Sequence, residues 1–202
     1  MGTTNSNTIC TVLILGIEKA GKSLLLKKML ELKKKEKEMS NIEPTLGFNY
    51  VNLEFSNQNY NIMDLGGDSV SRSFWPTIYR SISVNIVIYV FNLFDTENYN
   101  QAIIEFVKLA NEEELKSASL FLLFNVINYE NKILLSNNED VNDINLKVDY
   151  ILSLIRDTPI YEFDNRTTYF VCNLSKLKEG EFNTMKMLNK CLLVKEKDTG
   201  NI

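Results

Sequence analysis

Residues 16–23 are the part of this sequence most clearly placed to do chemistry. They read GIEKAGKS and match the pattern G-x-x-x-x-G-K-[ST] at every defined position. Glycines at both ends let the backbone curl so that successive N–H groups point at one phosphate. In such a loop Lys22 reaches the β- and γ-phosphates of a nucleotide, and the Ser23 hydroxyl ligates Mg²⁺. The alternative is a glycine-rich turn that fits the pattern by chance. The residues predicted to surround the phosphates are Gly16, Glu18, Lys19, Ala20, Gly21, Lys22, Ser23 and Leu24.

The motif requires a strand before it and a helix after it, and the sequence supplies both. Residues 9–15 are β-branched and apolar on both faces, which is typical of a strand buried inside a parallel sheet. Residues 24–39 carry apolar side chains at helical spacing, so a helix follows the loop. The positive end of that helix dipole then faces the phosphates. This context favours the phosphate site over the chance turn.

The rest of the chain alternates between strands and helices. Residues 50–55 and 60–64 are predicted to form an antiparallel hairpin that turns at residues 57–59. Further strands are predicted at residues 84–91, 118–124 and 167–172, and further helices at residues 98–110, 148–155 and 182–194. This rhythm predicts a three-layer α/β domain whose six-stranded sheet is mainly parallel with one antiparallel edge strand.

The domain is placed at residues 9–196, between an N-terminal tail at residues 1–8 and a C-terminal tail at residues 197–202. Residues 129–149 are polar and rich in Asn and Asp, and they interrupt the alternation. We therefore expect a polar insertion on the surface there.

Composition excludes several classes of protein. The net charge is −4, which argues against a generally basic nucleic-acid binder. The sequence has no histidine, so Ser-His-Asp catalysis and histidine metal ligation are ruled out. Its 3 cysteines show no CxxC spacing and suggest neither a disulfide framework nor a zinc site; Cys10 and Cys172 are expected to be inert core residues. No apolar run is long enough to span a membrane, and no signal peptide is evident, so a cytoplasmic protein is expected.

Three further motifs follow residues 16–23, the phosphate loop, in a fixed order. They are EPTLGFN at residues 43–49, DLGG at residues 64–67, and SFWP at residues 73–76. With the phosphate loop, they closely resemble the Arf and Arf-like branch of the Ras-type small GTPases, over residues 9 to about 125. The resemblance implies the fold of the P-loop NTPases, with GTP or GDP and Mg²⁺ as ligands.

The resemblance also implies roles for single residues. Thr45 corresponds to the switch I threonine, whose hydroxyl and backbone meet Mg²⁺ and the γ-phosphate. Asp64 corresponds to the carboxylate in the outer sphere of the Mg²⁺, so Ser23, Thr45 and Asp64 form the implied metal site. The Gly67 N–H would face the γ-phosphate. Taken singly, Thr45 could instead be a turn residue and Asp64 a cap at the end of a strand.

Asp68 stands where the family has the glutamine that orients the attacking water. At roughly 5 Å from a phosphate charge, with an effective dielectric near 20, the repulsion is about 3 kcal/mol. Asp68 should therefore either turn away from the phosphate or hinder hydrolysis. The remaining alternative is that Asp68 acts as a new general base.

The guanine-reading motif also departs from the family. Asn125 is in place, but the sequence has 25 asparagines, so one match carries little weight. Val126 replaces a lysine and Asn128 replaces an aspartate, whose carboxylate would accept both guanine N–H groups. Losing that charged acceptor should weaken guanine binding about 10- to 150-fold. Cys172 and Asn173 stand where the family has its last nucleotide loop.

Gly2 lies in MGTTNS, which fits the signal for N-myristoylation. The resemblance favours acylation, whereas residues 1–8 contain no Trp, Phe or Leu to insert into a membrane. A single acyl chain would give only marginal binding to a membrane. The neighbouring aromatic residues Phe74 and Trp75 either pack under a helix or form an exposed docking patch.

Two functions are therefore expected. In the first, the protein is a monomeric switch in which Mg²⁺-GTP orders residues 40–50 and 65–80. It would hydrolyse GTP slowly and act in membrane or intracellular trafficking. Effectors, exchange factors or GTPase-activating proteins would bind residues 40–80, and acylated Gly2 would contact membranes. In the second, a degenerate GTPase fold works as a non-hydrolysing interaction module. An ATP-using P-loop kinase is disfavoured because no basic lid segment follows.

Overall fold

The computed structural model describes residues 9–31, 47–55, 58–126, 138–160 and 162–174. Thr45, Asn128, Gly2 and the helix expected at residues 182–194 lie outside these ranges.

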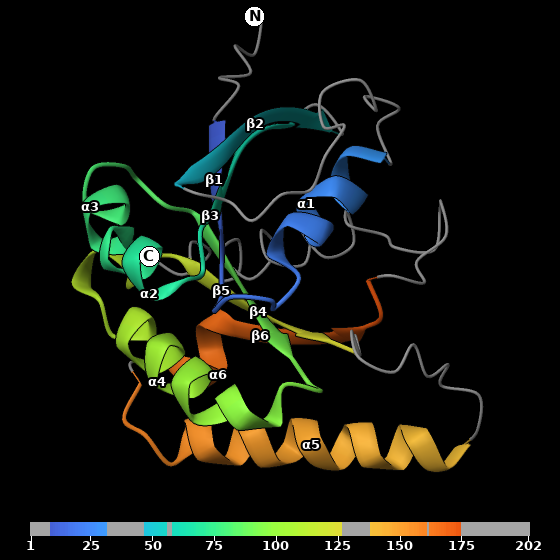
Figure 1. Ribbon diagram of the computed structural model, residues 1–202. Coiled ribbons are helices and arrows are strands. Elements are labelled where there is room, and N and C mark those ends of the chain that lie inside the picture. Colours follow the sequence, from blue (N-terminus) through green and yellow to red (C-terminus); the bar gives the residue numbers. More distant parts are fainter. Residues whose placement is uncertain (1–8, 32–46, 56–57, 127–137, 161, 175–202) are drawn as a thin grey trace, which may run out of the picture.

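A six-stranded sheet forms the centre of the fold, with the strand order β2-β3-β1-β4-β5-β6 (Figure 1). Its strands are β1 (Ile9–Leu15), β2 (Phe48–Phe55), β3 (Gln58–Leu65), β4 (Ile86–Asn92), β5 (Ser119–Asn125) and β6 (Thr167–Cys172). All neighbouring strands pair in parallel except β2, which runs antiparallel to β3 at one edge. The predicted fold class is confirmed. Because the parallel strands share one direction, the loops after β1, β3, β4, β5 and β6 gather at the same edge of the sheet.

Helices cover both faces of the sheet, so the domain has three layers. They are α1 (Lys22–Glu31), α2 (Ser69–Ser73), α3 (Trp75–Tyr79), α4 (Tyr99–Ala110), α5 (Asn138–Arg156) and α6 (Phe163–Arg166), with short 3₁₀ turns at Thr96–Asn98 and Glu113–Leu115. In Figure 1, α1 lies on one side of the sheet, and α4 and α5 lie together on the other. Within the described residues, no helix is both long and apolar enough to cross a membrane.

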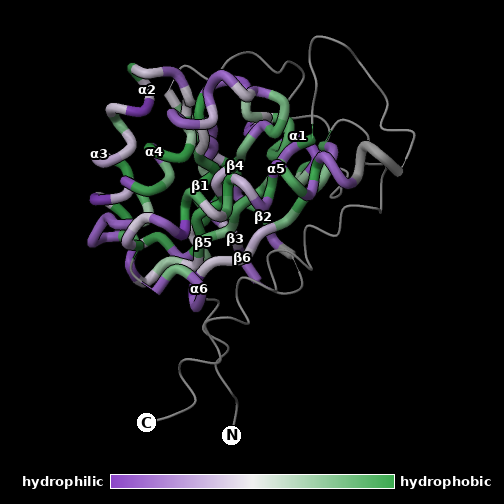
Figure 2. Tube along the Cα trace, turned by 90° about the horizontal axis from the view of Figure 1, so that it is seen from below, coloured by the Kyte–Doolittle hydropathy of each residue, from purple (hydrophilic) through white to green (hydrophobic). Residues whose placement is uncertain are grey.

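The core consists of two apolar clusters, one on each face, because successive side chains of a strand point to opposite sides. Along β1, Val12 and Ile14 pack with α1, whereas Leu13 and Leu15 pack with α4 and α5. Both sets are buried, which explains why β1 is apolar on both faces. Figure 2 shows the hydrophobic strands in the middle of the molecule and hydrophilic stretches around them.

The predicted strands at residues 9–15 and 167–172 are confirmed at both ends. The hairpin is also confirmed, but the expected turn at residues 57–59 is wrong in part. Gln58 and Asn59 belong to β3, where they pair with Phe55 and Glu54. Strand pairing therefore outweighs the turn preference of these polar residues.

The helix expected at residue 148 begins ten residues earlier, at Asn138. Ile144, Val148, Ile151 and Ile155 are all buried and recur at helical spacing. The Asn- and Asp-rich positions between them form the solvent face of this helix. The second half of the expected insertion is therefore part of α5, which packs on the sheet.

Candidate functional site

The phosphate loop joins the end of β1 to the start of α1 with an unusual backbone. Gly16, Lys19 and Gly21 have positive φ values of 144°, 60° and 103°. A Cβ at Gly16 would lie 2.5 Å from the Val90 carbonyl oxygen, and one at Gly21 would lie 2.3 Å from the Asn125 Nδ2. Neither position has room for a side chain. The loop is thus packed directly against the ends of β4 and β5.

Lys22 is held inside this loop. Its Nζ donates a hydrogen bond to the Ile17 carbonyl at 3.0 Å, and only 7% of the residue is exposed. Burial lowers the pKa of Lys22 from 10.5 to about 8, although the nearby Asp64 carboxylate opposes that change. A buried ammonium lacks solvation, so a phosphate placed beside it would gain a strong partner.

Ser23 and Asp64, two residues of the implied metal site, are hydrogen-bonded to each other. The Ser23 Oγ donates a hydrogen bond to the Asp64 Oδ2 at 2.7 Å, and the Asn49 Nδ2 approaches the same oxygen at 3.3 Å. Asp64 is fully buried near the end of β3, where it pairs with Ile14 of β1. Its carboxylate therefore joins α1 to the sheet. A hydroxyl beside a carboxylate is the hard oxygen set that suits Mg²⁺.

Gly67 lies directly against the phosphate loop. A Cβ at this position would lie 2.3 Å from the Lys22 Nζ, 2.6 Å from the Ile17 carbonyl carbon and 2.7 Å from the Glu18 nitrogen. No side chain fits there. The backbone of Gly67 thus lies against Lys22 and against the Ile17–Glu18 peptide group of the phosphate loop.

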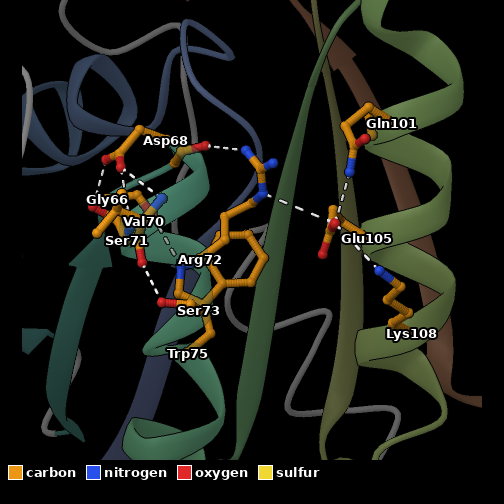
Figure 3. A network of polar contacts seen from close by, with 12 residues as sticks. Gly66, Asp68, Val70, Ser71, Arg72, Ser73, Trp75, Gln101, Glu105 and Lys108 are labelled. Carbon is orange, nitrogen blue, oxygen red and sulfur yellow. Dashed lines mark hydrogen bonds and ion pairs between the residues drawn. The ribbon is translucent and has the colours of Figure 1, made fainter.

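Asp68 forms the N-cap of α2 (Figure 3). Its Oδ1 accepts hydrogen bonds from the backbone N–H groups of Val70 at 3.0 Å and Ser71 at 2.9 Å, and its Oδ2 accepts one from the Ser71 hydroxyl. These bonds, led by that of the Ser71 hydroxyl, lower the pKa of Asp68. Of the expected alternatives, the geometry favours a carboxylate that turns into the helix end. A carboxylate already bonded to several donors is a poor general base.

Asn125 connects three loops. Its Nδ2 donates a hydrogen bond to the Ala20 carbonyl at 3.0 Å, and its Oδ1 accepts one from the Leu174 N–H at 3.3 Å. The Cys172 carbonyl accepts a hydrogen bond from Val126 at 2.8 Å. The phosphate loop, the end of β5 and the Cys172–Leu174 segment are therefore fastened together. Burial raises the pKa of the Cys172 thiol to about 12, as expected for an inert core cysteine.

The remaining residues predicted to surround the nucleotide differ in how exposed they are. Glu18 and Lys19 are exposed, Ala20 is buried, and Leu24 and Asn173 are half-buried. Phe74 and Trp75 were expected either to pack under a helix or to form an exposed patch. Trp75 is 4% exposed and packed in the core, whereas Phe74 is 58% exposed.

Arg72 is not among the residues that the sequence predicts for the site. Its Nη1 donates a hydrogen bond to the Gly67 carbonyl at 2.7 Å, and its Nε lies 4.0 Å from the Glu105 carboxylate. Trp75 donates its indole N–H to the Gly66 carbonyl at 3.0 Å. Only the order of Arg72 and Trp75 after the double glycine could have signalled these contacts.

Comparison with known proteins gives a consistent result. The model of the ADP-ribosylation factor family matches residues 2–188. The chain is 36% identical over 113 residues to ADP-ribosylation factor-like protein 2 of Dictyostelium discoideum, covering 56% of this chain and 57% of that protein. It is 31% identical over 156 residues to ADP-ribosylation factor J of the same organism, covering 75% and 79%. The alignment to ADP-ribosylation factor 1 of Brassica rapa subsp. pekinensis covers 62% of that protein at 31% identity. The chain thus spans less than two thirds of the length of several relatives.

Among solved structures, the chain resembles the Arl6 BBS3 small GTPase from Trypanosoma brucei, determined with the bound nucleotide analogue GppNp. The TM-score is 0.62 at 17% identity, and the alignment covers 94% of this chain and 99% of that one. At this identity the likeness concerns the fold.

Proposed function

The chain belongs to the ADP-ribosylation factor family, and on this premise we propose that it is a GTP/GDP switch whose two states differ in residues 40–50 and 65–80. The observation that carries the proposal is the meeting of Lys22, the Ser23–Asp64 pair and Gly67 at one edge of the sheet. A nucleotide with Mg²⁺ needs a cation and backbone N–H groups for its phosphates, and oxygen ligands for the metal. Lys22, the glycine backbone and the Ser23–Asp64 pair would supply them.

Mg²⁺ is the metal that this oxygen set fits. The hydroxyls of Ser23 and Thr45 would hold it, with Asp64 in its outer sphere. When bound, the ion neutralises charge on the phosphate oxygens. The chain's own groups act beside it: Lys22 supplies a fixed positive charge, the loop backbone supplies N–H donors, and Gly67 borders the γ-phosphate position.

Hydrolysis is proposed to be slow. The family's glutamine would present a neutral amide to the attacking water. Asp68 offers only acceptor oxygens, and these already bond to Val70 and Ser71. A partner that brings an arginine would then be needed to end the signal efficiently.

We assign effectors, exchange factors and GTPase-activating proteins to residues 40–80 of a monomer. Exposed apolar side chains in this part of the chain, namely Phe48, Tyr50, Val70 and Phe74, support that assignment. Membership of the family supports a role in membrane or intracellular trafficking. The proposed location is the cytoplasm, with contact to membranes through an acylated Gly2.

The proposal is tested by replacing Lys22. Lys22→Ala removes the cation beside the phosphates, so affinity for a fluorescent GTP analogue should fall at least about tenfold in a titration, as for loss of a charged hydrogen bond. Lys27→Ala, five residues further along α1, is the matched control and should bind like the parent. Equal affinity of Lys22→Ala and the parent would refute the proposal.

A second candidate function is a non-hydrolysing interaction module. Two observations favour it: Asp68 is used as a helix cap, and Val126 is buried at 4% exposure where the family has a lysine. This candidate predicts that the parent and Lys22→Ala bind a protein partner equally well.

A further inference from the structure

We propose that Trp75 is a positioning residue for triphosphate recognition, because its indole N–H and the Arg72 guanidinium hold the two peptide groups on either side of the Gly67 Cα. The inference rests on the proposed nucleotide switch. It adds which side chains orient the Gly67 N–H toward the γ-phosphate.

Three consecutive peptide groups are held in this segment. The Gly66 N–H donates a hydrogen bond to the Gly47 carbonyl at 2.9 Å. The Gly66 carbonyl accepts one from the Trp75 Nε1 at 3.0 Å. The Gly67 carbonyl accepts one from the Arg72 Nη1 at 2.7 Å. A pair of glycines has wide freedom of φ and ψ, so such contacts decide how its peptide groups point.

Holding the Gly66 carbonyl also orients the Gly67 N–H. The two belong to one planar peptide group, and in a trans peptide they point in opposite directions. No described peptide bond is cis. With its carbonyl turned toward Trp75, this peptide group presents the Gly67 N–H on the opposite side. Gly67 itself lies against Lys22 and Glu18 of the phosphate loop.

The two holding side chains are anchored outside the phosphate site. Trp75 is packed in the core cluster shared with α4 and α5. The Arg72 Nε lies 4.0 Å from the Glu105 Oε1 of α4. That oxygen also accepts a hydrogen bond from the Gln101 Nε2 at 2.7 Å and lies 3.5 Å from the Lys108 Nζ (Figure 3). The orientation of the Gly67 N–H is therefore fixed relative to the hydrophobic core and to α4.

Trp75→Phe tests the proposal, since it keeps an aromatic ring in the core and removes the indole N–H. Dissociation constants are measured for GDP and for a non-hydrolysable GTP analogue at the same Mg²⁺ concentration. The preference for triphosphate over diphosphate should fall about 2- to 10-fold, as expected for loss of one hydrogen bond. GDP affinity should stay close to that of the parent, because GDP has no γ-phosphate for Gly67 to meet.

The affinity ratio is the decisive readout, because a partly unfolded fraction lowers both affinities equally and cancels. Arg72→Gln should move the ratio in the same direction. Tyr99→Phe is the control: it removes a buried hydroxyl that donates to the Leu93 carbonyl and not to the double glycine, and should leave the ratio unchanged. An unchanged ratio in Trp75→Phe, with or without weaker binding of both nucleotides, would overturn the inference and leave the switch standing. A folded parent that binds neither nucleotide would overturn the switch itself.

Discussion

Lys22→Met should make the nucleotide-free protein more stable while it weakens nucleotide binding. Lys22 is buried in the phosphate loop, and its pKa is lowered from 10.5 to about 8. Such a change corresponds to a cost of about 3 kcal/mol for keeping the ammonium charged in the folded state at pH 7. Met has a similar length and no charge. We expect a gain of about 1–3 kcal/mol in the free energy of unfolding, where the lower bound allows for the lost hydrogen bond to Ile17.

The pH dependence gives the same prediction a second readout. Between about pH 8 and pH 10.5 the Lys22 side chain is neutral in the folded chain and charged in the unfolded chain. The unfolded state then binds more protons, so the stability contributed by this group rises with pH across that window. The advantage of Lys22→Met over the parent should therefore shrink from pH 7 to pH 9.5.

The assay is urea unfolding of the nucleotide-free parent and variant at pH 7 and pH 9.5, followed by circular dichroism. Taking the difference between the two proteins cancels other titrating groups, such as Tyr79 and Tyr89, whose pKa values burial raises. A variant that is less stable than the parent at pH 7, or a difference in stability that does not depend on pH, would contradict the prediction. It would show that burial of the Lys22 ammonium does not destabilise the nucleotide-free protein.

Two further predictions concern hydrolysis and base choice. Asp68→Gln should release phosphate faster than the parent in a single turnover, and the parent should react at or below the order of 10⁻⁴ s⁻¹ seen for Ras-type proteins unaided; a parent faster than the variant would identify Asp68 as a catalytic base. Asn128→Asp should tighten GTP relative to XTP in competition titrations, because it restores an acceptor for both guanine N–H groups; a parent that already prefers GTP strongly over ITP and XTP would show that another residue reads guanine.

Several features were predictable because their signals are local. The phosphate loop is one contiguous motif, and its glycines were placed by type and spacing where the structure leaves no room for a Cβ. The strand at residues 9–15 is apolar on both faces and was placed at both ends. The cap formed by Asp68 is also a local signal, since Asp is a favoured N-cap residue.

Other features depend on contacts that no local pattern reveals. α5 begins at Asn138 because buried residues such as Ile144 and Val148 pack on α4 and the sheet, although the segment reads as polar. The bonds from Arg72 and Trp75 to the double glycine join groups whose alignment depends on how α2 and α3 fold back. Asn125 looked unremarkable among many asparagines, and only the assembled sheet brings it to Ala20 and Leu174.

The most direct test of the central claim is the nucleotide that copurifies with the folded protein. The protein is purified with Mg²⁺ present and denatured, and the released small molecules are identified by ion-exchange chromatography and mass spectrometry. We expect GDP or GTP in stoichiometric amount from the parent and a marked loss of it from Lys22→Ala. A folded parent that releases no guanine nucleotide, and takes up none when GTP and Mg²⁺ are added, would contradict the central claim.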